Sequence, residues 1–284
     1  MTHKYIVYMG SGGLCHMLSG LSTAIKYAIS HNRILVIDCL KLSSFKNKVL
    51  TYFDININNL IIQENYNDII NDKFFDIEIK DRPKINPKVI KGKGYFIGKY
   101  NVSSFHNDQI DNKIIFYAGY GARNINNMIK INMNTLKIIE NECNNLLVNN
   151  KKYISLHYRN TDRKHDINNF LNKIKNNRLK FKKENIETIF IATDDYLAFD
   201  KFKKNLDDFN CIRINIIEDC NGKNIHYHSS DKNKLVLDLL KDIYMILHST
   251  YFIPSVKSGV SRWIIQMIHE KINIFDINSE CKLI

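Results

Sequence analysis

Charged and polar side chains follow an apolar, strand-like run in the stretch SLHYRNTDRKHD, residues 155–166. Ligands of parallel sheets bind beyond the carboxyl ends of the strands, and His157, Arg159, Asp162 and Arg163 would lie at such an end. An arginine there suits a diphosphate, because its planar guanidinium binds two oxygens at once and keeps its charge. A cluster of surface salt bridges gives a similar pattern and is the alternative. The stretch therefore predicts a site for an anionic ligand.

A glycine-rich turn, GSGGLCHML at residues 10–18, follows the first apolar run and opens a segment of helical period. Gly12 and Gly13 would let the backbone approach a ligand closely, and a helix N-terminus offers unpaired N–H groups. The turn matches neither GxGxxG nor a P-loop, so a tight connection without a ligand is an equal alternative. Its position after a strand favours the first interpretation, in which the turn lies beside a ligand-binding cleft.

A third polar group ends the apolar run IFIATDD at residues 189–195, where Thr193, Asp194 and Asp195 stand together. Carboxylates at a strand end accept hydrogen bonds from a ribose or a guanine edge. They also cap the helix that follows, which is the commoner use of aspartate at such a position.

The fourth segment, residues 242–263, predicts a helix, a strand and a turn into another helix. Ser258 and the amides of Gly259 and Val260 would form the N-terminus of that last helix, an arrangement that binds phosphate. Asp242 lies sixteen residues before Ser258, on the preceding helix.

Evidence for a metal site is weak in this sequence. His226 and His228 would share one side of a strand, but no third ligand is evident nearby. No Asp-x-Asp occurs anywhere, so the commonest pattern for a divalent metal on a nucleotide-sugar is missing. Cationic side chains would then have to neutralise a diphosphate, and we expect neither a metal nor a cofactor.

The composition describes a basic chain of 284 residues with a formal net charge of +12. Its lysines are dispersed, and an AT-rich coding sequence explains them as well as a basic groove for an anionic ligand does. No signal peptide or membrane-length apolar run is seen, and the six cysteines form no close pairs. We therefore expect a cytoplasmic protein without a transmembrane segment.

Apolar runs alternate with segments of helical period, which predicts an α/β fold with largely parallel sheets. The expected strands are residues 4–9, 33–38, 113–121, 152–158, 188–193, 211–217, 250–255 and 272–277. The expected helices are residues 14–30, 133–149, 167–176, a helix after 195, 232–248 and 259–269. Residues 41–112 give no clear pattern. Two Rossmann-like domains, 1–150 and 151–284, would account for this order.

These segments together resemble the GDP-fucose-dependent fucosyltransferases of the α1,6 type, which include bacterial nodulation enzymes and, more distantly, protein O-fucosyltransferases. The motif His-x-Arg-Arg-Thr-Asp of that family is similar to residues 157–162, and Ala-Thr-Asp-Asp to residues 192–195. Asp242, Ser258 and Arg262 resemble the last motif of the family, and the first 40 residues carry Gly13, Leu18 and Arg33 in the order of its N-terminal turn, helix and strand.

The resemblance implies an inverting, metal-independent glycosyltransferase of the GT-B type that moves fucose from GDP-fucose to a glycan hydroxyl. Residues 151–284 would bind the GDP-sugar donor, with a last helix that packs back on the first domain, and residues 1–150 the acceptor. Nucleic acid is not an expected partner. Arg159 would stabilise the departing diphosphate, with His157, Asp194 and Asp242 as polar partners of the nucleoside.

Two departures from the family pattern bear on the site. Asn160 stands where the family has its second arginine. The acidic residue proposed as the base in the core enzymes corresponds to Ile167, and Asp166 precedes it, so Asp166 or Asp162 would deprotonate the acceptor. The alternatives are a transferase that uses another nucleotide-sugar, such as GDP-mannose, and a non-catalytic module that binds nucleotides or RNA, although no RRM- or KH-like signature is visible.

Overall fold

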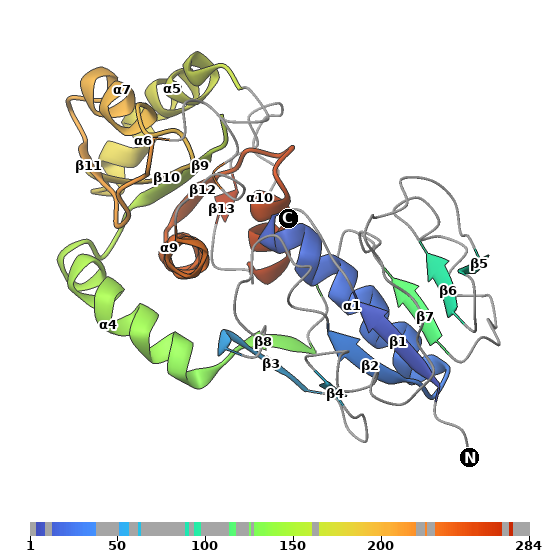
Figure 1. Cartoon of the computed structure of the whole chain (residues 1–284). Coiled ribbons are helices and arrows are strands. Elements are labelled where there is room, and N and C mark those ends of the chain that lie inside the picture. The colour runs from blue at the N-terminus through green and yellow to red at the C-terminus, as the bar shows by residue number, and fades with distance from the viewer. Residues whose placement is uncertain are drawn as a thin grey trace. The chain divides into compact units, whose positions relative to one another are not determined.

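The chain forms two compact units, Met1–Thr135 and Leu136–Ile284, in the computed structural model shown in Figure 1. Each unit has its own largely parallel sheet, which confirms the predicted α/β class. The two units divide near the start of helix α4 (Met133–Asn149), most of which belongs to the second unit, and the domain boundary at residue 150 stays a prediction. The structure describes residues 4–8, 13–37, 51–56, 62–63, 89–90, 94–97, 114–117, 125, 128–160, 165–219, 225, 231–268 and 273–274.

A six-stranded sheet forms the centre of the first unit. Its order is β4 (Ile62–Gln63), β2 (Ile34–Ile37), β1 (Tyr5–Tyr8), β7 (Ile114–Tyr117), β6 (Gly94–Ile97) and β5 (Val89–Ile90). Neighbouring strands are parallel except β5 and β6. Strands β3 (Phe53–Ile55) and β8 (Ile129–Ile131) form a short antiparallel pair, and β8 directly precedes helix α4 in sequence.

Helix α1 (Leu14–Ser30) connects β1 to β2 and is buried on almost every side. Two of its buried hydroxyl groups bond within the helix, because Ser22 and Thr23 donate to carbonyls one turn earlier at 2.9 and 3.3 Å. Tyr8 on β1 donates its hydroxyl to the Met17 carbonyl at 2.6 Å. The helix is therefore a core element of the first unit, as its dense apolar sequence requires.

The second unit is built around a five-stranded, parallel sheet. Its order is β11 (Asn210–Ile212), β10 (Thr188–Thr193), β9 (Ile154–Tyr158), β12 (Tyr251–Ile253) and β13 (Asn273–Ile274). Strand β9 is central, and every residue of it is buried. Burial along the whole length of a strand is typical of a sheet that is covered on both faces.

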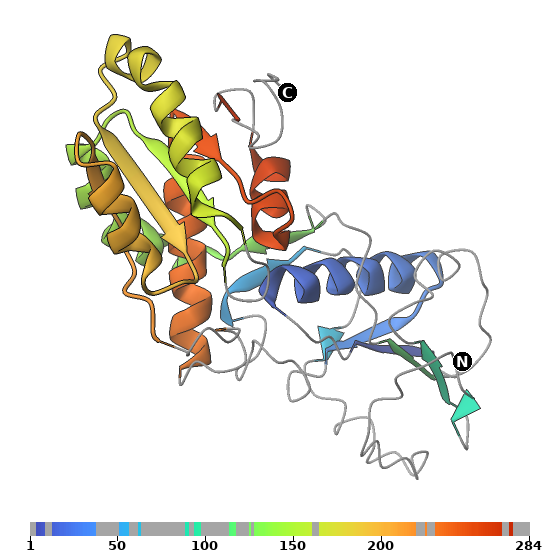
Figure 2. The ribbon, with the colours of Figure 1, turned by 90° about the horizontal axis from the view of Figure 1, so that it is seen from above.

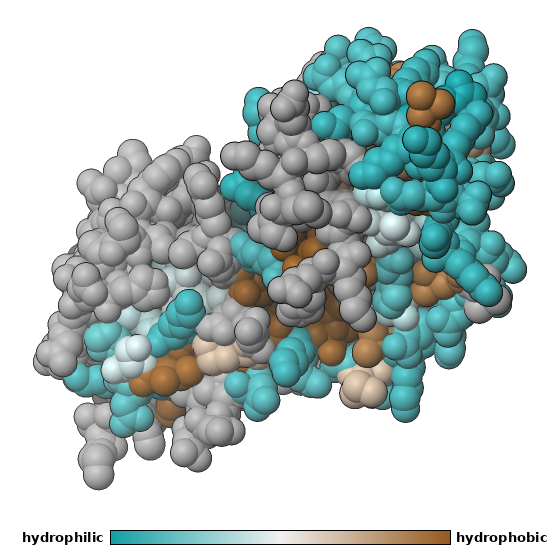
Figure 3. Space-filling model, turned by 180° about the vertical axis from the view of Figure 1, so that it is seen from behind, coloured by the Kyte–Doolittle hydropathy of each residue, from teal (hydrophilic) through white to brown (hydrophobic). Residues whose placement is uncertain are grey.

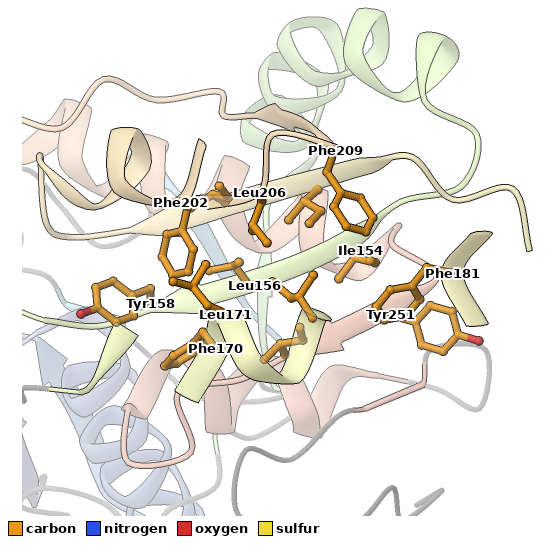
Figure 4. Packing of buried hydrophobic residues seen from close by; sticks show 14 of the residues in the cluster. Ile154, Leu156, Tyr158, Phe170, Leu171, Phe181, Phe202, Leu206, Phe209 and Tyr251 are labelled. Atoms are coloured by element: carbon orange, nitrogen blue, oxygen red, sulfur yellow. The ribbon is translucent and has the colours of Figure 1, made fainter. Parts of the chain in front are cut away.

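Helices lie on both faces of this sheet (Figure 2), and Figure 4 shows the β9 side chains that point to one of these faces. Ile154, Leu156 and Tyr158 join the hydrophobic core under α5 (Ile167–Asn176), α6 (Arg178–Lys183) and α7 (Ala198–Asn205). Ser155 and His157 point to the other face, where α9 (Lys232–Leu247) and α10 (Gly259–Met267) lie. The period of two along a strand thus delivers His157 to helix α10.

Several predicted elements have the observed bounds, including the helices at residues 14–30, 133–149 and 167–176 and the strand at 188–193. The strand predicted at residues 211–217 is wrong beyond Ile212. The chain leaves the sheet there because the Arg213 guanidinium lies over the Phe199 ring at 4.3 Å and Asn215 bonds to helix α9. Helix α6 was not predicted.

The surface of the second unit is largely hydrophilic over the end that carries α5 and α7 (Figure 3). Large apolar side chains that are exposed, such as Leu179 and Ile216, are few among the described residues. Within the described ranges, no helix combines the length and the apolar character that crossing a membrane demands.

Candidate functional site at the carboxyl edge of the second sheet

Arg159 and Asp194 form an ion pair where β9 and β10 end. The parallel register sets Ala192 beside His157 and Thr193 beside Tyr158, so the next residues of the two strands also come together. The Arg159 Nε atom lies 3.0 Å from Asp194 Oδ2, and the two side chains are 16% and 9% exposed. The carboxylate thus fixes the direction of a guanidinium that still reaches the surface.

Asn160 completes a clamp between the two strand ends. Its backbone N–H donates to Asp194 Oδ1 at 2.8 Å, and its side-chain Nδ2 donates to Asp195 Oδ2 at 2.7 Å. Asp195 also accepts a hydrogen bond from the Leu197 N–H at 3.0 Å, and this bond closes a turn before helix α7. The two carboxylates therefore organise the backbone and side chain next to Arg159, and their predicted contacts with a nucleoside stay predictions.

His157 lies two residues before Arg159 and faces helix α10. Its Nδ1 atom is 2.7 Å from the Ser261 hydroxyl oxygen. Burial, followed by the positive charges of Arg159 and His165, lowers the pKa of His157 from 6.5 to about 3. The imidazole is accordingly neutral at physiological pH and adds no charge to the site.

Helix α10 begins at this same edge. Ser258 is its N-cap and accepts a hydrogen bond from the Val260 N–H at 3.2 Å, so that amide is used inside the cap. Ser255 ties the turn to β9, because its hydroxyl donates to the His157 carbonyl at 2.8 Å and accepts from the Arg159 N–H at 3.1 Å. The Gly259 N–H has no hydrogen-bond partner among the described residues. It is therefore one amide of this turn that an anion could take.

Asp166 caps helix α5 and is exposed to solvent. Its Oδ1 atom accepts from the Asn168 N–H at 2.9 Å. Tyr158 links this helix start to β9, since its hydroxyl donates to the His165 carbonyl at 2.9 Å. Burial, with the nearby carboxylates of Asp195, Asp166 and Asp194, raises the pKa of Tyr158 to about 12, so the phenol remains a donor.

Asp242 belongs to a separate polar group on helix α9. Asn215 donates from Nδ2 to Asp242 Oδ1 and to the Asp238 carbonyl, both at 2.8 Å. Burial and the neighbouring charge of Asp238 raise the pKa of Asp242 well above its usual value. Among the described residues, Asp242 makes no contact with Arg159, so the structure does not itself unite the two parts of the predicted donor site.

Gly13 is the N-cap of helix α1 in the first unit, and its N-terminal turn has no side-chain cap. Its φ of −72° and ψ of 165° are open to any residue, so a glycine is not required there by backbone conformation. Of the predicted site residues, Gly12, Asp162 and Arg163 lie outside the described residues, as do His226 and His228. In the parts of the chain that are described, no three His, Cys, Asp or Glu side chains form a metal-binding group.

Three residues of the site were missed by the sequence analysis: Asn215, Ser255 and Ser261. Ser255 stands just past the apolar run of β12, so the strand-end argument applied to Arg159 would have found it. Ser261 follows Ser258 by three residues and lies on the adjacent turn of the same helix. Asn215 has no local signal, because its partner lies on a helix 27 residues away.

An arginine and a helix N-terminus at the carboxyl edge of a parallel sheet are typical of a nucleotide-binding α/β protein. No protein-family model matches the chain, and no curated protein matches its sequence. Among solved structures, the fold is similar to that of the fucosyltransferase NodZ from Bradyrhizobium, with a TM-score of 0.59 and 13% identity over 100% of this chain and 99% of that one.

Two further structures carry the same likeness. NodZ α-1,6-fucosyltransferase soaked with GDP-fucose matches with a TM-score of 0.60 and 13% identity, over 99% of each chain. POFUT1 in complex with GDP matches with a TM-score of 0.59 and 10% identity, over 97% of this chain and 99% of that one. The chain therefore has the fold seen in GDP-fucose fucosyltransferases, which are glycosyltransferases, and the resemblance drawn from the motifs is confirmed at the level of fold.

Proposed function

We propose that the protein is an inverting, metal-independent glycosyltransferase that moves fucose from GDP-fucose to a glycan hydroxyl. The observation that carries this proposal is the guanidinium of Arg159, oriented by Asp194 at the carboxyl edge of the sheet. The proposal includes a GT-B arrangement in which the second domain binds the donor and the first binds the acceptor. The fold likeness to enzymes studied with GDP and GDP-fucose supports this choice of donor.

In the proposed reaction, the acceptor oxygen attacks C1 of fucose from the face opposite the diphosphate. The bond between C1 and the diphosphate oxygen breaks, and its electron pair leaves with GDP. Arg159 and the Gly259 N–H would stabilise the growing negative charge, because both are held in place before the reaction begins. The acceptor proton passes to a carboxylate, for which Asp166 and Asp162 are the candidates.

Asp166 can be tested as the base without disturbing the fold. An asparagine caps a helix about as well as an aspartate, so Asp166→Asn keeps the bond to the Asn168 N–H while removing the basic carboxylate. A large loss of turnover with unchanged thermal stability would support Asp166. Unchanged turnover would eliminate it and leave Asp162→Asn as the variant to measure.

The choice of donor is tested by thermal shift with GDP, UDP and single-stranded RNA, followed by incubation with GDP-fucose or GDP-mannose on a glycan array. Stabilisation by GDP alone and transfer from GDP-fucose are the expected results. Transfer from GDP-mannose would favour another nucleotide-sugar. Stabilisation by RNA without any transfer would favour a non-catalytic module, and no response to GDP would contradict the proposal.

A further inference from the structure

Ser261 is fully buried, and its hydroxyl contacts a single hydrogen-bonding group among the described residues, the Nδ1 atom of His157 at 2.7 Å. A serine hydroxyl carries one proton, and a neutral imidazole carries one proton on either nitrogen. If Nδ1 carried the proton and donated to Ser261, the hydroxyl proton would be buried without an acceptor. The arrangement that satisfies both groups has Ser261 donate to an unprotonated Nδ1.

That bond determines what the opposite side of the ring presents. With Nδ1 as acceptor, the proton of the neutral ring resides on Nε2, which is directed away from helix α10 by the geometry of the imidazole. His157 is 6% exposed, and its Nε2 atom has no hydrogen-bond partner among the described residues. The ring thus offers one N–H donor at the end of β9, near the positive charge of Arg159.

We infer that Ser261 is a positioning residue that holds His157 as the Nε2–H tautomer, so that the ring donates a hydrogen bond to an oxygen of the bound nucleoside diphosphate. This inference rests on the proposed function, because it names a contact within the same donor site. Burial and the charge of Arg159 also oppose a second proton on the ring, which keeps the donor neutral. A neutral donor binds its acceptor in the same way at every pH at which the protein is folded and the ring is uncharged.

Two substitutions of His157 distinguish the tautomers, because each amide places its nitrogen near one ring position. In His157→Gln the side-chain NH₂ lies near the position of Nε2, and in His157→Asn it lies near that of Nδ1. The inference predicts that the Gln variant binds GDP with an affinity close to that of the unmodified chain. The Asn variant is expected to lose roughly tenfold or more, the effect of one lost hydrogen bond of this kind.

Ser261→Ala tests the positioning role directly. The ¹⁵N spectrum of histidine-labelled protein, without nucleotide, should show His157 protonated on Nε2 in the unmodified chain and a mixture of tautomers in Ser261→Ala. GDP affinity should fall by a few-fold to tenfold in that variant. Ser249→Ala is the matched control, because it removes another buried hydroxyl of the second unit, 2.8 Å from Ser155 in the half of β9 away from the site. It should leave both the spectrum and the affinity unchanged.

The results separate this inference from the proposed function. If the unmodified chain does not bind GDP in calorimetry, the proposed function fails and this inference fails with it. If GDP binds but His157 is protonated on Nδ1, or if the Asn variant binds better than the Gln variant, only the role of Ser261 is overturned. GDP binding with the predicted tautomer and the predicted order of variants supports both.

Discussion

Both units place a helix directly after a parallel strand, yet the two strand ends are built differently. In the first unit, the N-cap of helix α1 is Gly13, without a side-chain cap, and the hydroxyls of Ser22 and Thr23 donate to carbonyls of the same helix. In the second unit, the ends of β9 and β10 are linked by side chains, chiefly Arg159 with Asp194 and Asn160 with Asp195. Among the described residues, helix α1 thus serves as a packing element of the first unit, whereas the ends of β9 and β10 form an organised polar edge in the second.

The largest loss of activity is expected from Arg159→Ala, which removes the positive charge at the carboxyl edge of the second unit's sheet. We predict a loss in turnover of about a hundredfold or more, because preorganised charge stabilisation is usually worth that much. Thermal stability should also fall, because the side chain is only 16% exposed and its loss leaves the nearly buried Asp194 carboxylate without its ionic partner. Steady-state kinetics with GDP-fucose is the measurement, with Arg159→Lys as the variant that keeps the charge. Near-full activity of the alanine variant would contradict the proposal that Arg159 stabilises the departing diphosphate.

A smaller effect is expected when the arginine stays but its orientation is lost. Asp194→Asn should lower kcat/KM about tenfold or more, because the guanidinium loses its ionic partner. Asp208→Asn is the control, since Asp208 pairs with Arg178 at the opposite edge of the same sheet, where both side chains are more exposed. Surface pairs of that kind contribute roughly 0–1 kcal/mol, so activity should not change. Equal losses in the two variants would mean that the effect is on folding.

The neutral state of His157 gives the second unit a pH dependence. The ring has a pKa of about 3 when folded and about 6.5 when unfolded, so the unfolded chain binds the extra proton as the pH falls below 6.5. Stability should therefore decrease from about pH 6.5 downward, by up to about 1.4 kcal/mol per pH unit from this group. His157→Gln should reduce that slope by about one proton in urea unfolding at pH 4.5, 5.5 and 6.5. An unchanged slope would show that His157 is protonated in the folded state.

The smallest effect concerns the two helix starts themselves. Ser258→Ala should cost about 1 kcal/mol, because it deletes the N-cap of α10, and it should weaken GDP binding at the edge where the cap lies. Gly13→Ala should cost less and leave GDP affinity unchanged, since its backbone conformation suits alanine. Denaturant unfolding and calorimetry on both variants make the comparison. A loss of GDP affinity that is larger in Gly13→Ala than in Ser258→Ala would indicate that the donor site lies in the first unit.

Local sequence patterns predicted the long elements well, because helices such as α1 and α4 carry a strong apolar period over several turns. Helix α6 was missed because it is six residues long and buries only Phe181. Strands β3 and β8 each have three residues, and their pairing joins Phe53 to Ile131 across a long stretch of chain. Such pairing has no local signature.

The strand-end argument identified Arg159 and Asp194 as site residues, since it depends only on where apolar runs stop. That these two residues pair with each other depends on the register of β9 with β10, which the sequence does not display. The role of Asp166 could not be predicted from the sequence. An aspartate before a helix has the same local sequence whether it serves as a cap or as a base. The partners of Asp242 were likewise fixed by the path of the chain after β11.

The central position of β9 has a consequence for measurements on every variant of this site. A strand that is hydrogen-bonded on both sides and buried throughout exchanges its amide protons only in openings close to global unfolding. The backbone of Leu156 and His157 is therefore a built-in reporter in deuterium exchange. If a variant loses activity while these amides keep their slow exchange, the defect lies in the catalytic site. If the amides exchange faster, the variant has destabilised the sheet that supports the site.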